Sequence, residues 1–410
     1  MAHCRYCKSE LSESFVDLGV SPVSNAFLDE TTRWKPEVFY PLATFVCSSC
    51  YLVQALDIES AEHHFNDNYI YFSSFSEEWV AHAKRFADAM VDSRRLDSKS
   101  QVVEIASNDG YLLQHFAKSQ IPVLGVEPSA NVARVAEEKG IPSLVRFFSQ
   151  DTARFLVDQG KAADLIVANN VLAHVPDIGD FVMGFKTLLK PEGAVSIEFP
   201  WLLNLIEKRQ FDTIYHEHYS YLSLIFLKKI VAKSGLEIFH VEEHPTHGGS
   251  LRVFLKHAGQ ASDPVRGTVA EFVDREIRAG LDKIQTYRKF TSQVAKVKFD
   301  LLEFLIQAKR EGKTVVGYGA PAKGNTLLNF CGVGREFLDF TVDRSPHKQG
   351  KLLPGSRIPV FAVEKIAETK PDYILILPWN LKNEIMGQLK EARLWGARFV
   401  VPIPHLEVLD

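Results

Sequence analysis

The chain has 410 residues, of which 46% are apolar and 24% charged, and its formal net charge is −4 with a pI near 6.4. This length predicts two to four domains, the composition excludes a disordered chain, and the slight acidity disfavours a nucleic-acid binder. The N-terminus lacks the apolar core of a secretory signal, and no uncharged apolar run of about 18 residues follows, so we expect a cytoplasmic protein without a membrane partner.

Four of the five cysteines form two CxxC pairs, Cys4 with Cys7 and Cys47 with Cys50. In a reducing compartment such pairs are typical of tetrahedral zinc–thiolate sites, and a redox dithiol is the alternative. Four thiolates leave no coordination position for water, so we expect a structural zinc ion. This ion would hold a lobe of residues 1–75, whose sequence shows little regular periodicity. The fifth cysteine, Cys331, is most simply a buried core thiol.

Residues 76–96 carry apolar residues at helical spacing after Ser76, a suitable N-cap that two glutamates follow. From residue 101 onward strand, turn and helix patterns alternate, with strands expected in the ranges 101–110, 121–129, 163–175 and 193–201. This alternation predicts a doubly wound parallel sheet. The ranges 236–244 and 250–258 would close it as an antiparallel hairpin. We therefore expect one α/β domain over residues 76–258.

The turn after the first of these strands indicates the cofactor. It contains a single glycine instead of GxGxxG and adds two acids, Glu104 and Asp109, which suits a cationic cofactor without phosphates such as S-adenosylmethionine. Glu127 ends the second strand and could bind both ribose hydroxyls. The same acid occurs in NAD enzymes, so a sugar-nucleotide oxidoreductase remains an alternative. We expect His174 on the rim of the pocket. The expected cofactor-binding residues are Glu104, Ser107, Asn108, Asp109, Gly110, Glu127, Asn169 and Asn170.

The stretch "FDTIYHEHYSYLS", residues 211–223, crowds three tyrosines, two histidines and Glu217 together after the fourth strand. Methyl transfer to carbon requires a general base and a group that stabilises the enolate oxygen, whereas transfer to oxygen demands less. The stretch therefore favours C-methylation, with a sugar O-methyltransferase as the closest alternative. An extended chain would place Tyr215, Glu217 and Tyr219 on one face, and a helix would align Tyr215 with His218. A metal site at His216, Glu217 and His218, or a structural aromatic turn, stays open.

Residues 259–310 read as one or two long connecting helices, and a second α/β domain is expected over residues 311–410. In "VVGYGAPAKGN" three glycines surround Lys323 at a strand–turn–helix junction, which is the pattern of a phosphate cradle without Walker spacing. Trp379 and Asn380 end a later strand, where they could meet a base or sugar. A diphosphate-bearing substrate across the two α/β domains would explain both features, and a ligand-free structural domain is the alternative.

Seven motifs in order resemble those of the sugar C-methyltransferases, which act on nucleotide-linked 4-keto-6-deoxysugars. They are the paired CxxC, "VEIASNDGYLL", "NNVLAHVPD", "YHEHYSYLS", "HGGSLRVF", "GYGAPAKGNTLLN" and "LPWN", and they cover almost the whole chain. The resemblance implies a zinc-binding N-terminal lobe, a central class I methyltransferase domain that binds S-adenosylmethionine, and a C-terminal Rossmann-like domain. It also implies methylation at C-3 of the sugar, next to the C-4 ketone, in branched deoxysugar biosynthesis.

By the same resemblance His218 is the expected base, with Tyr215 and Glu217 in the same catalytic stretch. His174 is expected to face it, and Tyr69 is the matching tyrosine of the N-terminal lobe. The choice between His218 and Tyr215 as the base, and between dTDP and GDP as the nucleotide, stays open here. The segment "HGGSLR" is expected near the cleft without an assigned role. The expected substrate-binding residues are Tyr71, Lys323, Asn325, Trp379 and Asn380.

Overall fold

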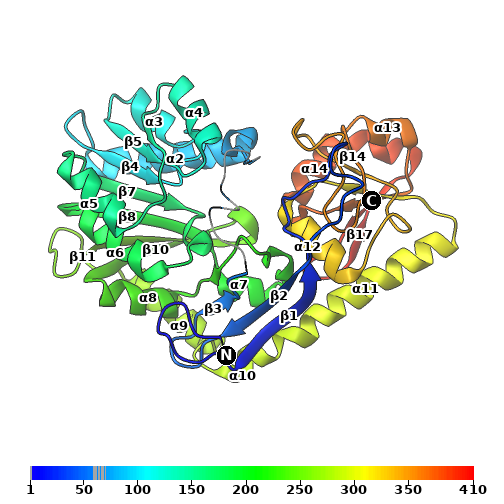
Figure 1. The fold of residues 1–410 in the computed structure, drawn as a ribbon, viewed down its shortest axis with the longest axis horizontal. Helices are drawn as coiled ribbons and strands as arrows, with labels where there is room; N and C mark the ends of the chain where they lie inside the picture. Colours follow the sequence, from blue (N-terminus) through cyan, green and yellow to red (C-terminus); the bar gives the residue numbers. More distant parts are fainter. Residues whose placement is uncertain (1, 59–61, 63–64, 66–68, 70) are drawn as a thin grey trace.

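The computed structural model describes residues 2–58, 62, 65, 69 and 71–410, which form three β-sheets with flanking helices (Figure 1). The first sheet has the order β1-β2-β3-β9, and all its neighbours are antiparallel: β1 (Glu13–Ser21), β2 (Tyr40–Val46), β3 (Val53–Ala55) and β9 (Ser220–Tyr221). The sequence pattern missed these strands. Two register irregularities in β1, between Ser14 and Val16 and between Asp17 and Val20, interrupt the alternation of buried and exposed residues.

The second sheet is the doubly wound α/β sheet that the sequence predicts. Its order is β10-β11-β8-β7-β4-β5-β6, with β4 to β8 parallel and β11 antiparallel to β8. Its strands are β4 (Val102–Ile105), β5 (Val123–Val126), β6 (Ser143–Leu144), β7 (Ala163–Asn169), β8 (Leu189–Pro200), β10 (Leu236–His244) and β11 (Ser250–His257). From β4 the chain adds β5 and β6 on one side and then β7 and β8 on the other, so a topological switch point lies between β4 and β7. Ligands of such sheets bind outside the carboxyl ends of the strands at the switch point.

Helices cover both faces of this sheet: α2 (Glu77–Arg94), α3 (Leu113–Lys118), α4 (Ala130–Glu138), α5 (Gln150–Asp158), α6 (Ile178–Leu188), α7 (Leu202–Glu207) and α8 (Leu224–Lys233). The predicted N-cap of the first long helix is confirmed, because the Ser76 side chain accepts a hydrogen bond from the Trp79 backbone N–H. Two glutamates in the first turn of α2 also stabilise its N-terminus electrostatically.

The third sheet is C-terminal, with the order β14-β13-β12-β15-β16-β17 and only β17 antiparallel. Its elements are β12 (Val315–Tyr318), α12 (Ala322–Cys331), β13 (Thr341–Val342), β14 (Val360–Phe361), α13 (Lys365–Thr369), β15 (Tyr373–Ile376), α14 (Lys382–Gln388), β16 (Arg398–Val401) and β17 (Glu407–Leu409). A parallel sheet of this kind with helices between its strands is the predicted Rossmann-like arrangement.

Three helices connect the two large sheets: α9 (Gly267–Arg278), α10 (Ile284–Arg288) and α11 (Phe290–Arg310). Figure 1 shows α11 running beside β1 toward the C-terminal lobe. The contact is apolar, since the rings of Phe15 and Phe290 stack 4.5 Å apart. The N-terminal strands and α11 thus link the two larger lobes at one end.

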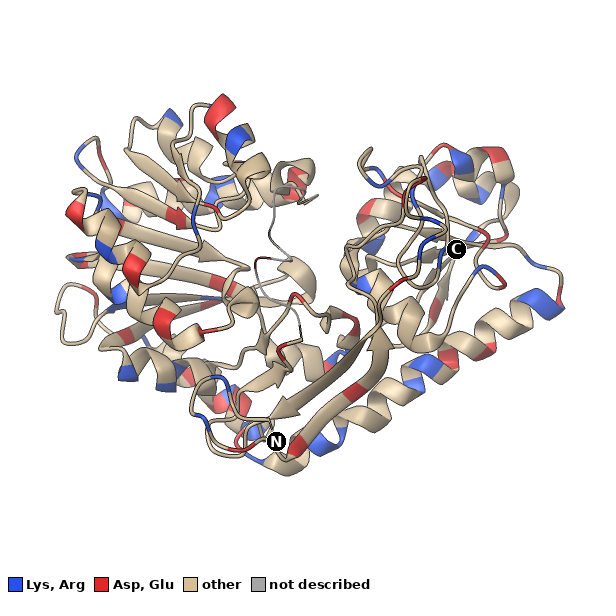
Figure 2. Ribbon diagram, viewed as in Figure 1, with Lys and Arg blue, Asp and Glu red and all other residues tan. Residues whose placement is uncertain are grey.

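Charges of both signs alternate along the outer helices, α11 included (Figure 2). Proteins that bind nucleic acids usually carry a continuous stripe of basic residues. The mixed charges along α11 do not form such a stripe. Within the described ranges no helix is long and apolar enough to cross a membrane.

Candidate active site and metal centre

The four predicted zinc ligands meet in space. Sγ of Cys4 lies 3.6 Å from Sγ of Cys50, Sγ of Cys7 lies 3.4 Å from Sγ of Cys47, and all four lie within 4.8 Å of one another. Zinc–sulfur bonds of about 2.3 Å in a tetrahedron place the sulfurs roughly 3.8 Å apart, so this donor set fits a zinc ion. Across the described residues only these cysteines gather three or more possible metal ligands, which leaves the alternative at His216 and His218 without support.

The metal lobe is paired directly with the proton-handling stretch. Gln54 in β3 is the register partner of Ser220 in β9, and the Ala55 N–H donates to the Tyr219 carbonyl at 3.1 Å. The Gln54 side chain in turn donates to the sulfur of Cys4 at 3.3 Å. One glutamine therefore connects a metal ligand to the strand that ends the stretch. Sequence spacing could not predict this pairing, because 166 positions separate the paired residues Gln54 and Ser220.

The turn after β4 has the sharp geometry of a cofactor-binding edge. Ala106, Asn108 and Gly110 adopt positive φ angles of 56°, 49° and 75°, which turn the chain from β4 toward α3. Burial raises the pKa of Glu104 well above its usual range. Four buried polar atoms at this edge have no hydrogen-bond partner within the described ranges: Glu104 Oε2, Ser107 Oγ, Asp109 Oδ1 and Asn169 Oδ1. Such atoms fit a polar, cationic cofactor, because a buried polar group without a partner is costly.

Glu127 lies at the end of β5 beside the same turn. Its two carboxylate oxygens accept hydrogen bonds from the backbone N–H groups of Asn108 at 3.0 Å and Ser129 at 2.9 Å. Burial raises the pKa of Glu127, and these two hydrogen bonds oppose that effect. The carboxylate is thus oriented at the strand end, where an acid can bind the two ribose hydroxyls of a nucleoside.

A segment from the N-terminal lobe lies against this edge and brings two predicted tyrosines to it. The Asn131 side chain donates to the Tyr69 carbonyl at 2.8 Å, and the Asn108 side chain donates to the Tyr71 carbonyl at 3.1 Å. The Asn108 amide oxygen also accepts from the Ser73 backbone N–H at 2.8 Å. Burial raises the pKa of Tyr69 well above its usual range, and the nearby Glu217 carboxylate adds to this effect.

Tyr215 and His218 form a hydrogen-bonded pair within a turn. The His218 N–H donates to the Tyr215 carbonyl, so the stretch is neither the extended segment nor the helix considered from sequence. His218 Nδ1 lies 2.8 Å from the Thr213 carbonyl, which can only accept, so Nδ1 carries the proton. Nε2 then accepts from the Tyr215 hydroxyl at 2.8 Å. Burial lowers the pKa of His218, which keeps Nε2 unprotonated at neutral pH.

Two further predicted residues surround this pair. His174 Nδ1 donates to the Glu217 carbonyl at 2.8 Å, and the His174 and His218 rings lie edge to face with centres 4.5 Å apart. The Glu217 carboxylate is buried and accepts a hydrogen bond from the Asn25 side chain at 2.6 Å. Burial raises the pKa of Glu217 to about 7, and the Asn25 hydrogen bond opposes this rise. Sequence reasoning missed Asn25, because nothing in its local pattern points to residue 217.

The C-terminal lobe contributes Lys323, Trp379 and Asn380 to the same region. Lys323 Nζ donates to the Asn380 side chain at 2.7 Å and lies 4.8 Å from the Trp379 ring centre. The Trp379 indole N–H donates to the buried Asp212 carboxylate at 2.6 Å. Asp212 was not predicted, although it belongs to the stretch, and burial raises its pKa to about 6. These contacts connect the C-terminal lobe to the start of the proton-handling stretch.

Asn325 was predicted to bind the substrate, but its side chain contacts the N-terminal lobe. It is buried in α12, and its side-chain N–H donates to the carbonyl of Ser24 in the N-terminal lobe at 2.7 Å. The structure therefore uses Asn325 in a contact between lobes, whereas Lys323, two positions earlier in α12, lies beside Trp379.

Comparison with known proteins gives three family models that together span most of the chain. A model described as a zinc binding domain matches residues 4–65, a "Methyltransferase domain" matches residues 76–241, and a "C-methyltransferase C-terminal domain" matches residues 245–404. The first match and the four gathered thiols confirm the predicted zinc-binding lobe.

Individual proteins are similar to the chain over different extents. The chain is 35% identical over 407 residues to the C-methyltransferase NovU of Streptomyces niveus, covering 99% of this chain and 96% of that protein. A ubiquinone biosynthesis O-methyltransferase of Chelativorans is 31% identical over 98 residues, covering 24% of this chain and 39% of that protein. Among solved structures, the magnesium protoporphyrin IX methyltransferase of Synechocystis with bound SAM has 14% identity and a TM-score of 0.34, covering 48% of this chain and 89% of that one.

Proposed function

The chain belongs to the C-methyltransferase family and is an S-adenosylmethionine-dependent methyltransferase, and we propose that its acceptor is C-3 of a nucleoside-diphosphate-linked 4-keto-6-deoxysugar. The observation that carries this proposal is the Tyr215–His218 pair, with an unprotonated Nε2 and a protonated phenol 2.8 Å apart. Removal of a proton from the carbon next to a ketone requires both of these groups. The base removes the proton, and the hydroxyl stabilises the oxygen on which negative charge develops.

In the proposed reaction Tyr215 turns its hydroxyl from His218 Nε2 to the C-4 oxygen of the sugar. The C-3–H bond breaks, its proton passes to Nε2, and the electron pair forms an enolate whose oxygen accepts the Tyr215 hydrogen bond. S-adenosylmethionine, when bound, would supply an electrophilic methyl group for the new bond at C-3, and the electron pair of the broken S–CH3 bond would stay on its sulfur. Burial raises the pKa of Tyr215 well above its usual range, so this side chain stays protonated and can donate.

The neighbouring residues have supporting roles in this proposal. His174 donates to the Glu217 carbonyl and packs edge to face on the His218 ring, so it orients the base. Tyr69 also stays protonated, because burial raises its pKa, and it is a second donor for a sugar oxygen. Glu104, Asp109 and Glu127 are the acidic groups proposed for a cationic donor, and a bound cation would favour the ionised form of Glu104, whose pKa burial raises. Asn169 is the last residue of β7 and Asn170 follows it at the same edge.

The nucleotide end of the substrate is assigned to the C-terminal lobe in this proposal. Lys323 supplies the positive charge for a diphosphate, and burial lowers its pKa while the nearby Asp212 carboxylate raises it. Asn380 and Trp379 lie against the same lysine. Tyr71, half-exposed beside the Asn108 turn, completes the proposed substrate-binding set. A substrate held in this way would extend from Lys323 to the Tyr215–His218 pair.

The test is hydrogen exchange at C-3. The protein is incubated in deuterium oxide with dTDP- or GDP-linked 4-keto-6-deoxysugar, with and without S-adenosylmethionine, and C-3 is followed by NMR and mass spectrometry. We expect protein-dependent deuterium uptake at C-3 and, once the donor is added, the mass gain of one methyl group there. His218→Asn should abolish both and leave S-adenosylhomocysteine binding unchanged. A methyl gain on oxygen without C-3 exchange would contradict the proposal.

A further inference from the structure

The "HGGSLR" segment, residues 247–252, runs from the turn between β10 and β11 into β11, and packing explains most of its residues. Gly248 has φ of 96°, and a Cβ there would lie 2.6 Å from Cη2 of Trp379. Gly249 has φ of 121°, and a Cβ there would lie 2.3 Å from Nδ2 of Asn204. Both positions therefore require glycine, on conformational and on steric grounds. The Ser250 hydroxyl closes the turn by donating to the Thr246 carbonyl at 2.9 Å.

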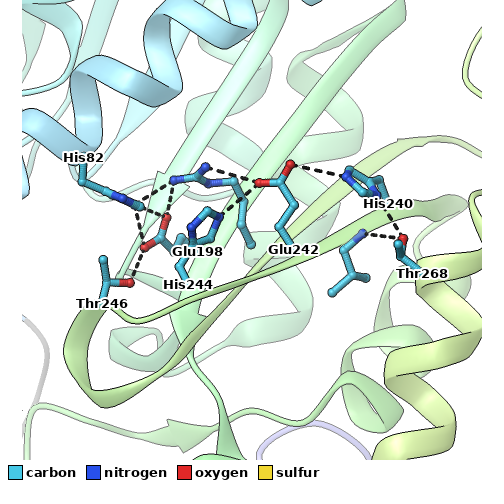
Figure 3. Close-up of polar contacts among 9 residues, drawn as sticks. His82, Glu198, His240, Glu242, His244, Thr246 and Thr268 are labelled. Carbon is cyan, nitrogen blue, oxygen red and sulfur yellow. Dashed lines mark hydrogen bonds and ion pairs between the residues drawn. The ribbon is translucent and has the colours of Figure 1, made fainter.

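A buried polar network holds both ends of this turn. The Thr246 hydroxyl donates to one oxygen of Glu198 at 2.8 Å, and Arg252 donates to the other at 2.6 Å. His82 Nε2 lies 2.9 Å from the same carboxylate, as Figure 3 shows. Arg252 also contacts Glu242. Figure 3 shows Glu242 in contact with His244 as well. Since two residues that flank the turn share one carboxylate, the turn is fixed against β8.

These contacts fix the backbone of His247 and leave part of its ring available. The residue has φ of 54°, and its ring lies edge to face with Trp79 at 5.0 Å. His247 Nε2 lies 3.0 Å from the Asn170 side-chain N–H and accepts from it, so a neutral ring carries its proton on Nδ1. That Nδ1–H makes no hydrogen bond to any described residue. The Asn170 side-chain oxygen is buried and equally without a partner in the part of the chain that the structure describes.

The charged groups around His247 favour an anion. Gly248 lies beside Trp379, and the ammonium of Lys323 lies 4.8 Å from the centre of that ring. The pKa of His247 is lowered to about 4, chiefly by burial and in part by the charges of Lys323 and His82, while the Glu198 carboxylate opposes this shift. His247 and Lys323 in turn both contribute to the low pKa of His218. The charge states of His247, Lys323 and His218 are therefore linked. The imidazole is thus neutral beside a buried lysine, in a position where added negative charge would protonate it.

We propose that His247 is a substrate-binding residue that, together with Lys323, binds the diphosphate of the substrate at the junction of the central and C-terminal sheets. Its Nδ1–H donates to a phosphate oxygen. The negative charge of the diphosphate favours protonation at Nε2, and the Asn170 amide then rotates so that its unpartnered oxygen accepts from the new N–H. The "HGGSLR" turn is thereby the scaffold of a phosphate contact. This inference rests on the proposed function.

Calorimetry of nucleotide binding tests the inference without turnover. Thymidine diphosphate is titrated into the whole protein at pH 6 in buffers of different ionisation enthalpy, which gives the number of protons taken up. The wild-type protein should take up close to one proton. His247→Asn should take up none and bind thymidine diphosphate about tenfold more weakly, as expected for loss of a charge-assisted hydrogen bond. The circular dichroism spectrum and the unfolding midpoint of the variant should match those of the wild type, which shows that the variant is folded.

Two further variants separate binding from structure. His247→Arg keeps a positive charge at all pH values, so it should retain most of the affinity and take up no proton. His405→Asn removes an exposed histidine whose partner is Glu407, and it should behave like the wild type. Nucleotide binding with a proton uptake that survives in His247→Asn would overturn the inference and leave the proposed function standing. If thymidine, uridine and guanosine diphosphates all failed to bind a protein that binds S-adenosylhomocysteine, both proposals would be overturned.

Discussion

Replacing Glu217 with glutamine should stabilise the protein in a pH-dependent way. In an unfolded chain this carboxyl loses its proton near its ordinary pKa of 4.5, whereas burial in the folded protein raises the pKa to about 7. The folded state therefore binds more protons between these two values, and its stability falls as the pH rises through that interval. A difference of this size corresponds to about 3 kcal/mol, at 1.36 kcal/mol for each pKa unit. Glutamine cannot ionise, so Glu217→Gln avoids this cost.

The assay is denaturant unfolding of the wild type and Glu217→Gln between pH 4.5 and pH 8. The free energy of unfolding of the variant should increase relative to that of the wild type as the pH rises. Between pH 4.5 and pH 8 this relative increase should reach about 3 kcal/mol. Asn25 can still donate to the glutamine oxygen, so the hydrogen bond itself is kept. C-3 exchange should fall in the same variant if the carboxylate assists enolisation. A stability difference that stays constant with pH would refute the reasoning.

Glu198 provides a matched control with the opposite sign. Burial raises its pKa, but the hydrogen bond from His82 and the charge of Arg252 outweigh that effect and lower it to about 2. Its ionised form therefore stabilises the fold above pH 4.5, and this contribution is lost as the pH falls toward 2. Glu198→Gln should destabilise the protein by about 3 kcal/mol or more at pH 7, because it leaves Arg252 without its buried partner.

Two further predictions concern the metal and the cofactor. Cys50→Ser should release the zinc ion, as measured by metal analysis, and S-adenosylhomocysteine should still bind the central sheet. The variant should also lose C-3 exchange, because β3 of the metal lobe and β9 of the proton-handling stretch share a sheet. A metal-free variant with full exchange would contradict this coupling. Glu127→Ala should weaken S-adenosylhomocysteine binding at least about tenfold in calorimetry, since hydrogen bonds to a charged group are each worth about 1.5–3 kcal/mol. The exposed Glu137→Ala is its control, and equal affinities in the two variants would rule out the ribose role.

The candidate site illustrates how far local sequence reasoning reaches. The expected cofactor edge follows from short-range order, because Glu104 and Glu127 lie at the carboxyl ends of β4 and β5, and the turn at Asn108 and Asp109 follows β4. Residues at the carboxyl ends of neighbouring parallel strands meet at one edge without further information. Lys323 and Trp379 were expected at strand ends of the C-terminal sheet for the same reason, and they lie together there.

The sequence by itself determined the two thiolate pairs, the main alternation of strands and helices in both α/β sheets, and the chemical content of residues 211–223. Their signals are short: a CxxC spacing, an apolar period, a run of proton-handling side chains. Only the tertiary structure decided that Asn25 contacts Glu217, that Trp379 contacts Asp212, and that β9 joins the sheet of the metal lobe. These partners are 166 to 192 positions apart. The packing of whole lobes brings these partners together, and the local hydrophobic periodicity of the sequence carries no information about such long-range contacts.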